Sequence, residues 1–150
     1  CGERGGEAVA DVLFGDYNPS GRLPITFPRH SGQLPMYYNY MPSKSGRHYV
    51  DMPITPLWEF GHGLSYTKFE YSNLKLGAKE IGTRGSVEVA ADIANVGGRA
   101  GEEVVQLYIQ GPVSTVTRPV KELKGFQKIA LQPGEKKTVR LSLSPEDLAH

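Results

Sequence analysis

The chain has 150 residues and a net charge of +1, and its composition, 39% hydrophobic and 22% charged, is typical of one globular domain or two small ones. Seventeen Lys and Arg residues against 16 Asp and Glu residues create no long-range field, so we expect no nucleic-acid partner. No apolar run approaches the roughly 20 residues of a membrane helix, so we also expect no membrane span.

The single cysteine, Cys1, stands at the first position. One cysteine can form neither an internal disulfide framework nor a cysteine zinc cluster. Cys1 could instead be the lipidated first residue of a processed lipoprotein, but a flexible polar tether usually follows such a residue, and here a helical pattern begins at once. Because no initiator Met is present either, we interpret the start as a boundary within a longer polypeptide.

The first block of the chain combines one predicted helix with one short predicted strand. Apolar residues recur at the spacing of a buried helical stripe and predict a helix over residues 3–14, ended by Gly15. The segment DYNPSGRLP has turn chemistry, and ITFP, residues 25–28, predicts an extended piece closed by proline. One helix and one strand cannot enclose a core, so we expect this block to pack on further structure.

Residues 29–66 show neither the helical nor the strand period. An irregular segment of this length is usually functional or lies over a neighbouring surface. It carries too many aromatic rings to leave in water, and we expect them to dock on another domain. These rings are Tyr37, Tyr38, Tyr40, Tyr49, Trp58, Phe60 and Tyr66.

From residue 69 the apolar period changes to two. In SVEVAADIANV, for example, Val89 and Ile93 are predicted on one face of a strand and Asp92 on the other. Regularly spaced strands of this kind indicate an antiparallel β-sandwich. The predicted strands are FEYSNLKL, SVEVAADIANV, EEVVQLYIQ, VKELKGFQKIAL and KKTVRLSLS.

The strand count predicts an incomplete sandwich. Residues 69–150 contain about five strand candidates, whereas an immunoglobulin-like sandwich has roughly seven over about 100 residues. We therefore expect about two strands to be missing, which would leave a sheet edge open. After the last strand, Ser144 and Pro145 predict a helix N-cap and first turn. The chain ends about one turn later, so we expect it to be a fragment.

Three long segments carry a family resemblance. They are GGEAVADVLFGDYNPSGRLPITFP, PLWEFGHGLSYTKFEYSNL and TRPVKELKGFQKIALQPGE. In this order they resemble the C-terminal region of glycoside hydrolase family 3, in particular the bacterial periplasmic β-glucosidases. His62 is a departure, because many relatives carry Tyr there. The resemblance implies a mainly β fold with an incomplete fibronectin type III-like sandwich. Residues 1–28 would be the end of an α/β-sandwich domain, residues 29–68 a connector, and residues 69–150 the fibronectin type III-like domain, truncated at its C-terminal end.

The resemblance also implies the activity of a larger enzyme, which is retaining hydrolysis of terminal β-linked sugars without a cofactor. The nucleophilic Asp would come from a (β/α)8 barrel and the acid/base Glu from the α/β domain, both upstream of Cys1. No catalytic residue is therefore expected in this chain, which would brace the catalytic domains and be inactive alone. Its partners would be the upstream barrel and α/β domains and, through them, a saccharide. A periplasmic or secreted location is implied, and a homodimer is left open.

Glu3 and Arg4, at the start of the first predicted helix, are candidates for substrate contact. By the resemblance they lie in a loop that faces the active-site crevice. Glu3, Glu7 and Asp11 also share one helical face, which could suggest paired catalytic carboxyl groups. A solvated acidic stripe gives the same pattern, and acids are favoured early in a helix, so we prefer that interpretation.

The histidines and glycines predict structural roles. His30, His48, His62 and His150 lack the short spacing of metal ligands, so no metal site is expected. Ser65 lacks the flanking pattern of a nucleophile elbow, and Ser20 belongs to a turn. Gly61 and Gly63 around His62 indicate a sharp corner and no phosphate loop. Arg118 and Lys121 are interpreted as charges that protect a strand edge.

Trp58, together with the tyrosines of this segment, is a candidate platform for stacking on sugar rings, and we favour an interdomain contact over that alternative. If the platform were exposed, the chain could be a carbohydrate-binding module. A non-catalytic adhesion or scaffold module of the fibronectin type is the other alternative.

Overall fold

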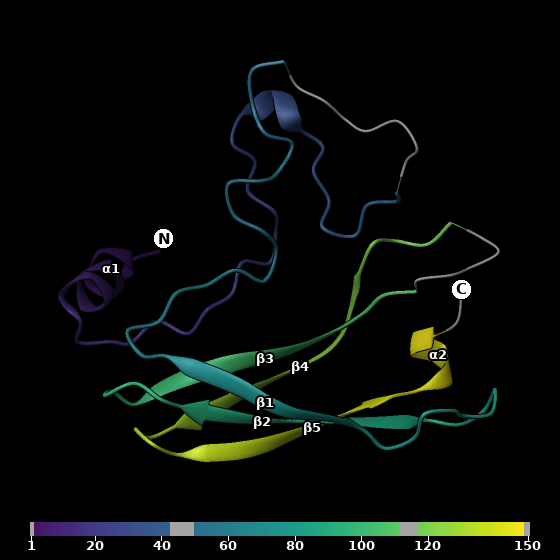
Figure 1. Cartoon of the computed structure of the whole chain (residues 1–150). Coiled ribbons are helices and arrows are strands. Elements are labelled where there is room, and N and C mark those ends of the chain that lie inside the picture. Colours follow the sequence, from purple (N-terminus) through teal and green to yellow (C-terminus); the bar gives the residue numbers. More distant parts are fainter. Residues whose placement is uncertain (1, 43–49, 112–116, 149–150) are drawn as a thin grey trace. The chain divides into compact units, whose positions relative to one another are not determined.

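The computed structural model describes residues 2–42, 50–111 and 117–148, and the chain forms two compact units (Figure 1). The first unit comprises residues 1–21, 64–105 and 125–150, and the second comprises residues 22–63 and 106–124. Predictions made for Cys1, His48, Tyr49 and His150 lie outside the described residues.

Helix α1 spans Gly5–Phe14, so the predicted helix is confirmed with a later start. Gly15 follows in the left-handed conformation, with φ 87°, and its N–H bonds to the carbonyl oxygen of Val12. Glycine is favoured here because it has no Cβ to clash. At the other end Glu3 and Arg4 form a turn in which the Gly5 N–H donates to the Gly2 carbonyl oxygen at 3.2 Å, and Arg4 takes the N-cap position without a side-chain cap.

Three antiparallel strands form one sheet of the first unit. They are β1 (Phe69–Leu76), β2 (Val87–Asn95) and β5 (Lys136–Leu143), in the order β1-β2-β5. The register shifts between Ser72 and Lys75, where Asn73 has φ 53°. Beyond this irregularity Lys75 pairs with Ala90, and Ala90 pairs with Arg140 on the other side. These three residues therefore form one row across the sheet.

The second sheet contains β3 (Gly101–Ile109) and β4 (Glu122–Leu131). Residues 101–105 and 125–131 of these strands belong to the first unit. All five predicted strands are thus confirmed to within a few residues at their ends.

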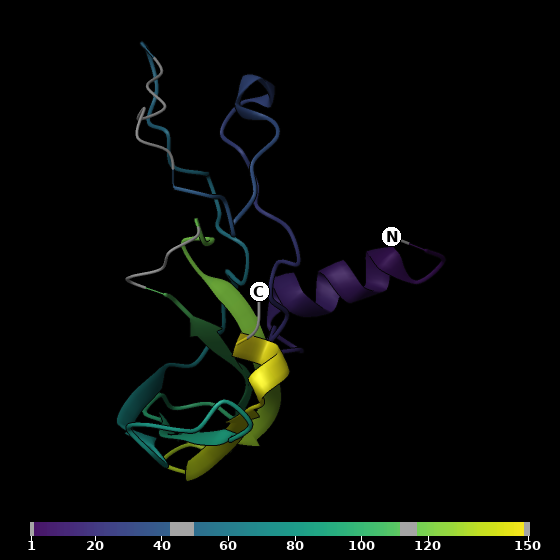
Figure 2. The same ribbon diagram turned by 90° about the vertical axis from the view of Figure 1, so that its right-hand side faces the viewer.

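The core of the first unit lies between residues of the two sheets. Val105, Ile129 and Leu131 come from β3 and β4, and they pack with Ile93 and Val139 from β2 and β5. Ile93 and Leu131 are the most deeply buried apolar side chains, at 0% and 1% exposure. The predicted β-sandwich is confirmed, and Figure 2 shows the strands of the two sheets from the side.

The prediction of a strand at residues 25–28 was wrong. Phe27 makes only an isolated bridge with Trp58, in which the Phe27 N–H donates to the Trp58 carbonyl oxygen at 2.9 Å. Pro24 and Pro28 lack the N–H donors that would extend the ladder, which explains why the pairing stops at one bridge.

The predicted connector also contains a short 3-10 helix that the sequence pattern did not reveal, Ser31–Gln33. Gln33 is buried at 2% exposure. Its side-chain oxygen accepts from the Arg29 N–H at 2.6 Å, and its amide donates to the Pro53 carbonyl oxygen at 3.0 Å. One buried amide therefore joins the two sides of this loop.

The second helix, α2 (Pro145–Leu148), continues from the end of β5 (Figure 2). Its predicted cap is confirmed, because the Asp147 N–H donates to Ser144 Oγ at 3.4 Å and the Ser144 N–H donates to Asp147 Oδ2 at 2.8 Å. Neither helix, nor any other helical segment of the described residues, is long and apolar enough to cross a membrane.

Candidate functional site

Glu3 and Arg4, the predicted substrate-proximal residues, are exposed at the entrance to α1. The Arg4 guanidinium donates two hydrogen bonds to the carboxylate of Glu7, with Nε–Oε2 at 2.8 Å and Nη2–Oε1 at 3.0 Å. Both side chains are more than half exposed, so this pair is weak in free energy. The arrangement favours the interpretation of Glu7 as part of a solvated helix face.

Trp58, the predicted sugar-stacking residue, belongs to the second unit. Its ring contacts Phe27 edge to face, with the centroids 5.8 Å apart and the planes inclined by 68°. The residue is still 46% exposed. Half of the indole surface is therefore used in packing and half is open.

Two other predicted aromatic residues, Tyr38 and Phe60, pack within the second unit. Their rings stack 4.1 Å apart at 13°, and Tyr38 also meets Tyr108 edge to face at 6.2 Å. Burial, followed by the nearby Tyr38 and Glu59, raises the pKa of Tyr108. The charge of Lys121 lies 5.7 Å above the Tyr108 ring.

The corner glycine Gly61 is confirmed as a sharp turn, with φ 80°. Its carbonyl oxygen accepts from the Gln106 side-chain amide at 3.1 Å. The neighbouring Glu59 pairs with Lys121 at 3.2 Å, so Lys121 has a specific partner in addition to its predicted protective role. Within the described residues no group of His, Cys, Asp and Glu side chains could hold a metal ion.

In the described part of the chain, the pKa values of the carboxyl groups of Glu102, Glu135 and Asp92 are lowered. A hydrogen bond from Lys128, then one from Ser20, lowers the pKa of Glu102, and the Gln132 backbone N–H, then Lys137, lowers that of Glu135. The pKa of Asp92 is lowered by a hydrogen bond from Asn73, then by hydrogen bonds from Thr138 and Lys136. A general acid in glycoside hydrolysis needs a raised pKa, so none of these three is suited to that role.

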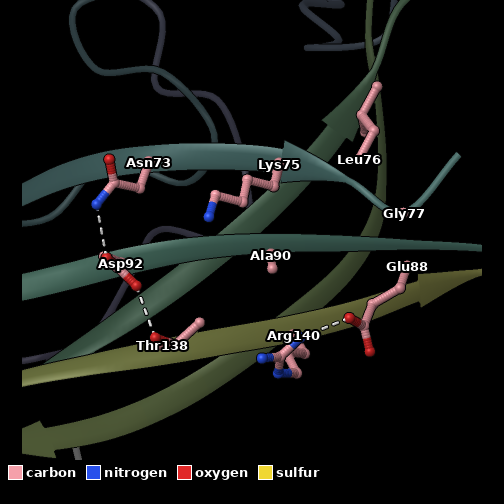
Figure 3. Close-up of a pocket in the computed structure, with 9 residues that line it drawn as sticks. All are labelled: Asn73, Lys75, Leu76, Gly77, Glu88, Ala90, Asp92, Thr138 and Arg140. Atoms are coloured by element: carbon pink, nitrogen blue, oxygen red, sulfur yellow. Dashed lines mark hydrogen bonds and ion pairs between the residues drawn. The ribbon is translucent and has the colours of Figure 1, made fainter. Parts of the chain in front are cut away.

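A polar hollow of about 470 Å³ lies on the outer face of the β1-β2-β5 sheet (Figure 3). Asp92 Oδ2 accepts from Asn73 Nδ2 at 2.8 Å, and Asp92 Oδ1 accepts from Thr138 Oγ1 at 2.6 Å. Arg140 donates to Glu88 at 2.7 Å. Sequence reasoning missed this hollow, because strand alternation predicts an outer face but not which outward side chains meet across three strands.

Asn18 joins the turn after α1 to the sandwich within the first unit. Its amide donates to the Ala100 carbonyl oxygen at 2.9 Å, while its side-chain oxygen accepts from Ser65 Oγ at 3.0 Å and from the Tyr66 N–H at 2.8 Å. Nearby, the Tyr66 hydroxyl donates to the Val12 carbonyl oxygen at 2.7 Å. Arg99 donates to the carbonyl oxygen of Gly15, the residue that ends α1. We call Asn18, Tyr66 and Arg99 the junction.

Family models match on both sides of this junction. The model of the glycosyl hydrolase family 3 C-terminal domain matches residues 1–66, and that of the fibronectin type III-like domain matches residues 103–150. The chain belongs to glycoside hydrolase family 3. It is a C-terminal region of that family, with its fibronectin type III-like domain, as the sequence resemblance predicted.

Known family 3 proteins resemble nearly the whole chain. It is 46% identical to a periplasmic β-glucosidase of Salmonella typhimurium and 45% identical to thermostable β-glucosidase B of Acetivibrio thermocellus, with 99% of the chain covered in each case. A solved β-glucosidase structure from Erythrobacter marinus matches with a TM-score of 0.90 at 49% identity, over 95% of the chain. The chain spans about a fifth of the length of these family 3 proteins, with 21%, 21% and 19% covered.

Proposed function

We propose that this chain is the C-terminal part of a retaining β-glucosidase and that it braces the catalytic domains of the complete enzyme. The β-glucosidase names of the Salmonella and Acetivibrio relatives support the activity. For the domains we propose residues 1–28 as the end of the α/β-sandwich domain, residues 29–68 as the connector and residues 69–150 as the fibronectin type III-like domain.

The bracing role depends on one observation, the hydrogen bonds of Asn18. Asn18 belongs to the part of the chain matched by the hydrolase C-terminal domain model, and Ala100 lies in the turn between β2 and β3 of the sandwich. A side chain that bonds both to the hydrolase C-terminal region and to the sandwich resists their separation, because opening the contact leaves polar groups without partners. In this proposal the fibronectin type III-like domain therefore holds the end of the α/β domain in place.

The two reacting carboxyl groups are contributed by other parts of the polypeptide, an Asp from the barrel and a Glu from the α/β domain. Retaining hydrolysis needs these groups about 5 to 5.5 Å apart. The lowered pKa values of Asp92, Glu102 and Glu135 support this division, and the 150-residue chain alone is then inactive. No cofactor is required, and Glu3 and Arg4 remain substrate-proximal positions at the exposed entrance to α1.

The test is to express the complete reading frame that contains this chain and to assay it with p-nitrophenyl β-D-glucoside. Proton NMR of the first sugar released should show the β-anomer, because retention needs two successive displacements. Release of the α-anomer would refute retention, and an upstream region without a barrel and a catalytic Asp would refute the enzyme assignment. Hydrolysis by the 150-residue chain alone would refute the proposed location of the carboxyl groups.

The name of the Salmonella relative supports a periplasmic or secreted location for the complete protein. Cell fractionation with an antibody against this chain checks the location.

The oligomeric state of the complete protein is a separate question. Light scattering of the complete protein distinguishes a monomer from a homodimer.

The half-exposed ring of Trp58 supports a second candidate function, a carbohydrate-binding module. A flat apolar face suits the C–H face of a pyranose ring. Glucan affinity that falls in Trp58→Ala, with the fold unchanged, would support it. Phe126→Ala, which removes an exposed ring in the first unit, is the control. The non-catalytic scaffold alternative is supported only if the upstream sequence lacks the barrel.

A further inference from the structure

Ala90 is the small floor of the polar hollow on the β1-β2-β5 sheet, and four charged side chains surround it (Figure 3). Lys75 and Arg140 are its direct cross-strand neighbours, on β1 and β5. Glu88 and Asp92 lie two residues before and after it on β2, so they share its face of the strand. Two basic groups thus flank the floor across the strands and two acidic groups flank it along the strand.

The spacing of these groups follows from sheet geometry. Neighbouring strands lie about 4.8 Å apart, so Lys75 and Arg140 start about 10 Å from each other. Residues two apart on a strand are separated by about 7 Å, so Glu88 and Asp92 start about 14 Å apart. The methyl group of Ala90 leaves the space between them open, which a larger side chain would fill.

The four charged side chains that line the hollow, Lys75, Arg140, Glu88 and Asp92, together carry no net charge. Arg140 pairs with Glu88, and Asp92 is held ionised by Asn73 and Thr138. Lys75 forms no ion pair with any described residue. Lys136, which is not one of the lining residues, pairs with Asp92 at 3.1 Å. A free anion would meet two carboxylates here and a free cation would meet two basic groups. The hollow therefore favours a neutral ligand that both donates and accepts hydrogen bonds.

We propose that this hollow binds a neutral saccharide unit. Each sugar hydroxyl can donate to a carboxylate oxygen of Glu88 or Asp92 and accept from Lys75 or Arg140, so donors and acceptors on all sides of the floor are used. The methyl group of Ala90 offers a small apolar surface to the C–H face of the ring. The volume of about 470 Å³ lies in the usual range for small-ligand pockets, about 300 to 1,000 Å³.

This binding site is independent of the proposed hydrolysis. It lies on the sandwich and uses neither of the two reacting carboxyl groups, so it would hold a sugar chain beside the catalytic domains without cleaving it. It also differs from the Trp58 platform, because none of its lining residues is aromatic.

The experiment is a titration of the ¹⁵N-labelled 150-residue chain with cellobiose, followed by the amide signals in two-dimensional NMR. The signals of Lys75, Ala90 and Arg140 are expected to shift together, with affinity in the millimolar range because the hollow is open. Lys75→Ala should weaken binding about fivefold, the loss of one hydrogen bond. Ala90→Leu should abolish it, because the larger side chain fills the floor of the hollow.

Lys68→Ala is the matched control, because Lys68 is an exposed lysine outside the hollow whose side chain makes a loose pair with Glu70 at 3.6 Å. It should bind cellobiose as the unchanged chain does. Sodium sulfate and glucuronate are titrated in parallel. Shifts with sulfate but not with cellobiose would overturn the proposal in favour of an anion site. The absence of shifts with cellobiose, or shifts that persist unchanged in both Lys75→Ala and Ala90→Leu, would also overturn it.

Discussion

The side chain of Asn18 donates a hydrogen bond to the main-chain oxygen of Ala100, 82 positions further along the chain. The same side chain accepts from the adjacent residues Ser65 and Tyr66, so one amide bonds to two other segments of the first unit. A turn residue of ordinary appearance in the sequence is therefore a long-range connector.

Replacement of Asn18 by Ala should lower the free energy of unfolding by about 1 to 3 kcal/mol, because three hydrogen bonds are lost. Urea unfolding followed by circular dichroism measures this. Asn39→Ala is the matched control, since Asn39 is exposed, and it should unfold at the same urea concentration as the unchanged chain. Equal midpoints for the two variants would show that the junction is not stabilising.

In the complete enzyme, Asn18→Ala should also lower the temperature at which activity is lost, with little change in kcat/KM for a glucoside at low temperature. The physical reason is that the junction holds two parts together and does not touch the substrate. A loss of kcat/KM without a change in heat inactivation would contradict the bracing role.

Gly61→Ala should be strongly destabilising, by about 1 to 3 kcal/mol, since it adds a Cβ at a positive φ. That Cβ would also lie 2.6 Å from the Tyr108 hydroxyl, so the contact with Tyr108 and Gln106 has to shift. Gly21→Ala is the control, because nothing lies within 4 Å of its added Cβ. Thermal melts of both variants, read from the near-ultraviolet signal of the aromatic residues, check the difference.

Leu131→Ala should lower the free energy of unfolding by about 2 to 5 kcal/mol, because Leu131 is 1% exposed and belongs to the core cluster. Leu74→Ala makes the same chemical change at a side chain that is 73% exposed, so its cost should be small. Urea unfolding of both variants provides the comparison. Similar costs would mean that the two sheets do not enclose a stable core in solution.

Acid should destabilise the first unit partly through Asp92. Its pKa is lowered in the folded state by Asn73, Thr138 and Lys136, so the ionised form is favoured by folding. The stabilising contribution is present above the ordinary Asp pKa of about 3.9 and is lost as the pH falls below it. We expect the free energy of unfolding to fall less between neutral pH and strong acid for Asp92→Asn than for the unchanged chain. If the free energy of unfolding depended on pH in the same way in both proteins, the role of Asp92 would be refuted.

The sequence by itself determined the local elements of this protein. The apolar spacing before Gly15 predicted α1, and the period of two predicted all five strands, because both signals depend on residues a few positions apart. Family motifs in the same sequence also predicted the β-glucosidase family and the sandwich, and these predictions are confirmed. The substrate-proximal roles of Glu3 and Arg4 and the stacking role of Trp58 remain predictions.

Only the tertiary structure decided which distant side chains meet. The strand predicted at residues 25–28 became a single Phe27–Trp58 bridge, since a strand persists only where a partner offers a ladder. The order β1-β2-β5 placed Lys75 and Arg140 on either side of Ala90, and the bonds of Asn18 joined a turn to the sandwich. Periodicity assigns each residue to a face, whereas contacts between strands depend on register and sheet order, which are set by packing of the whole chain.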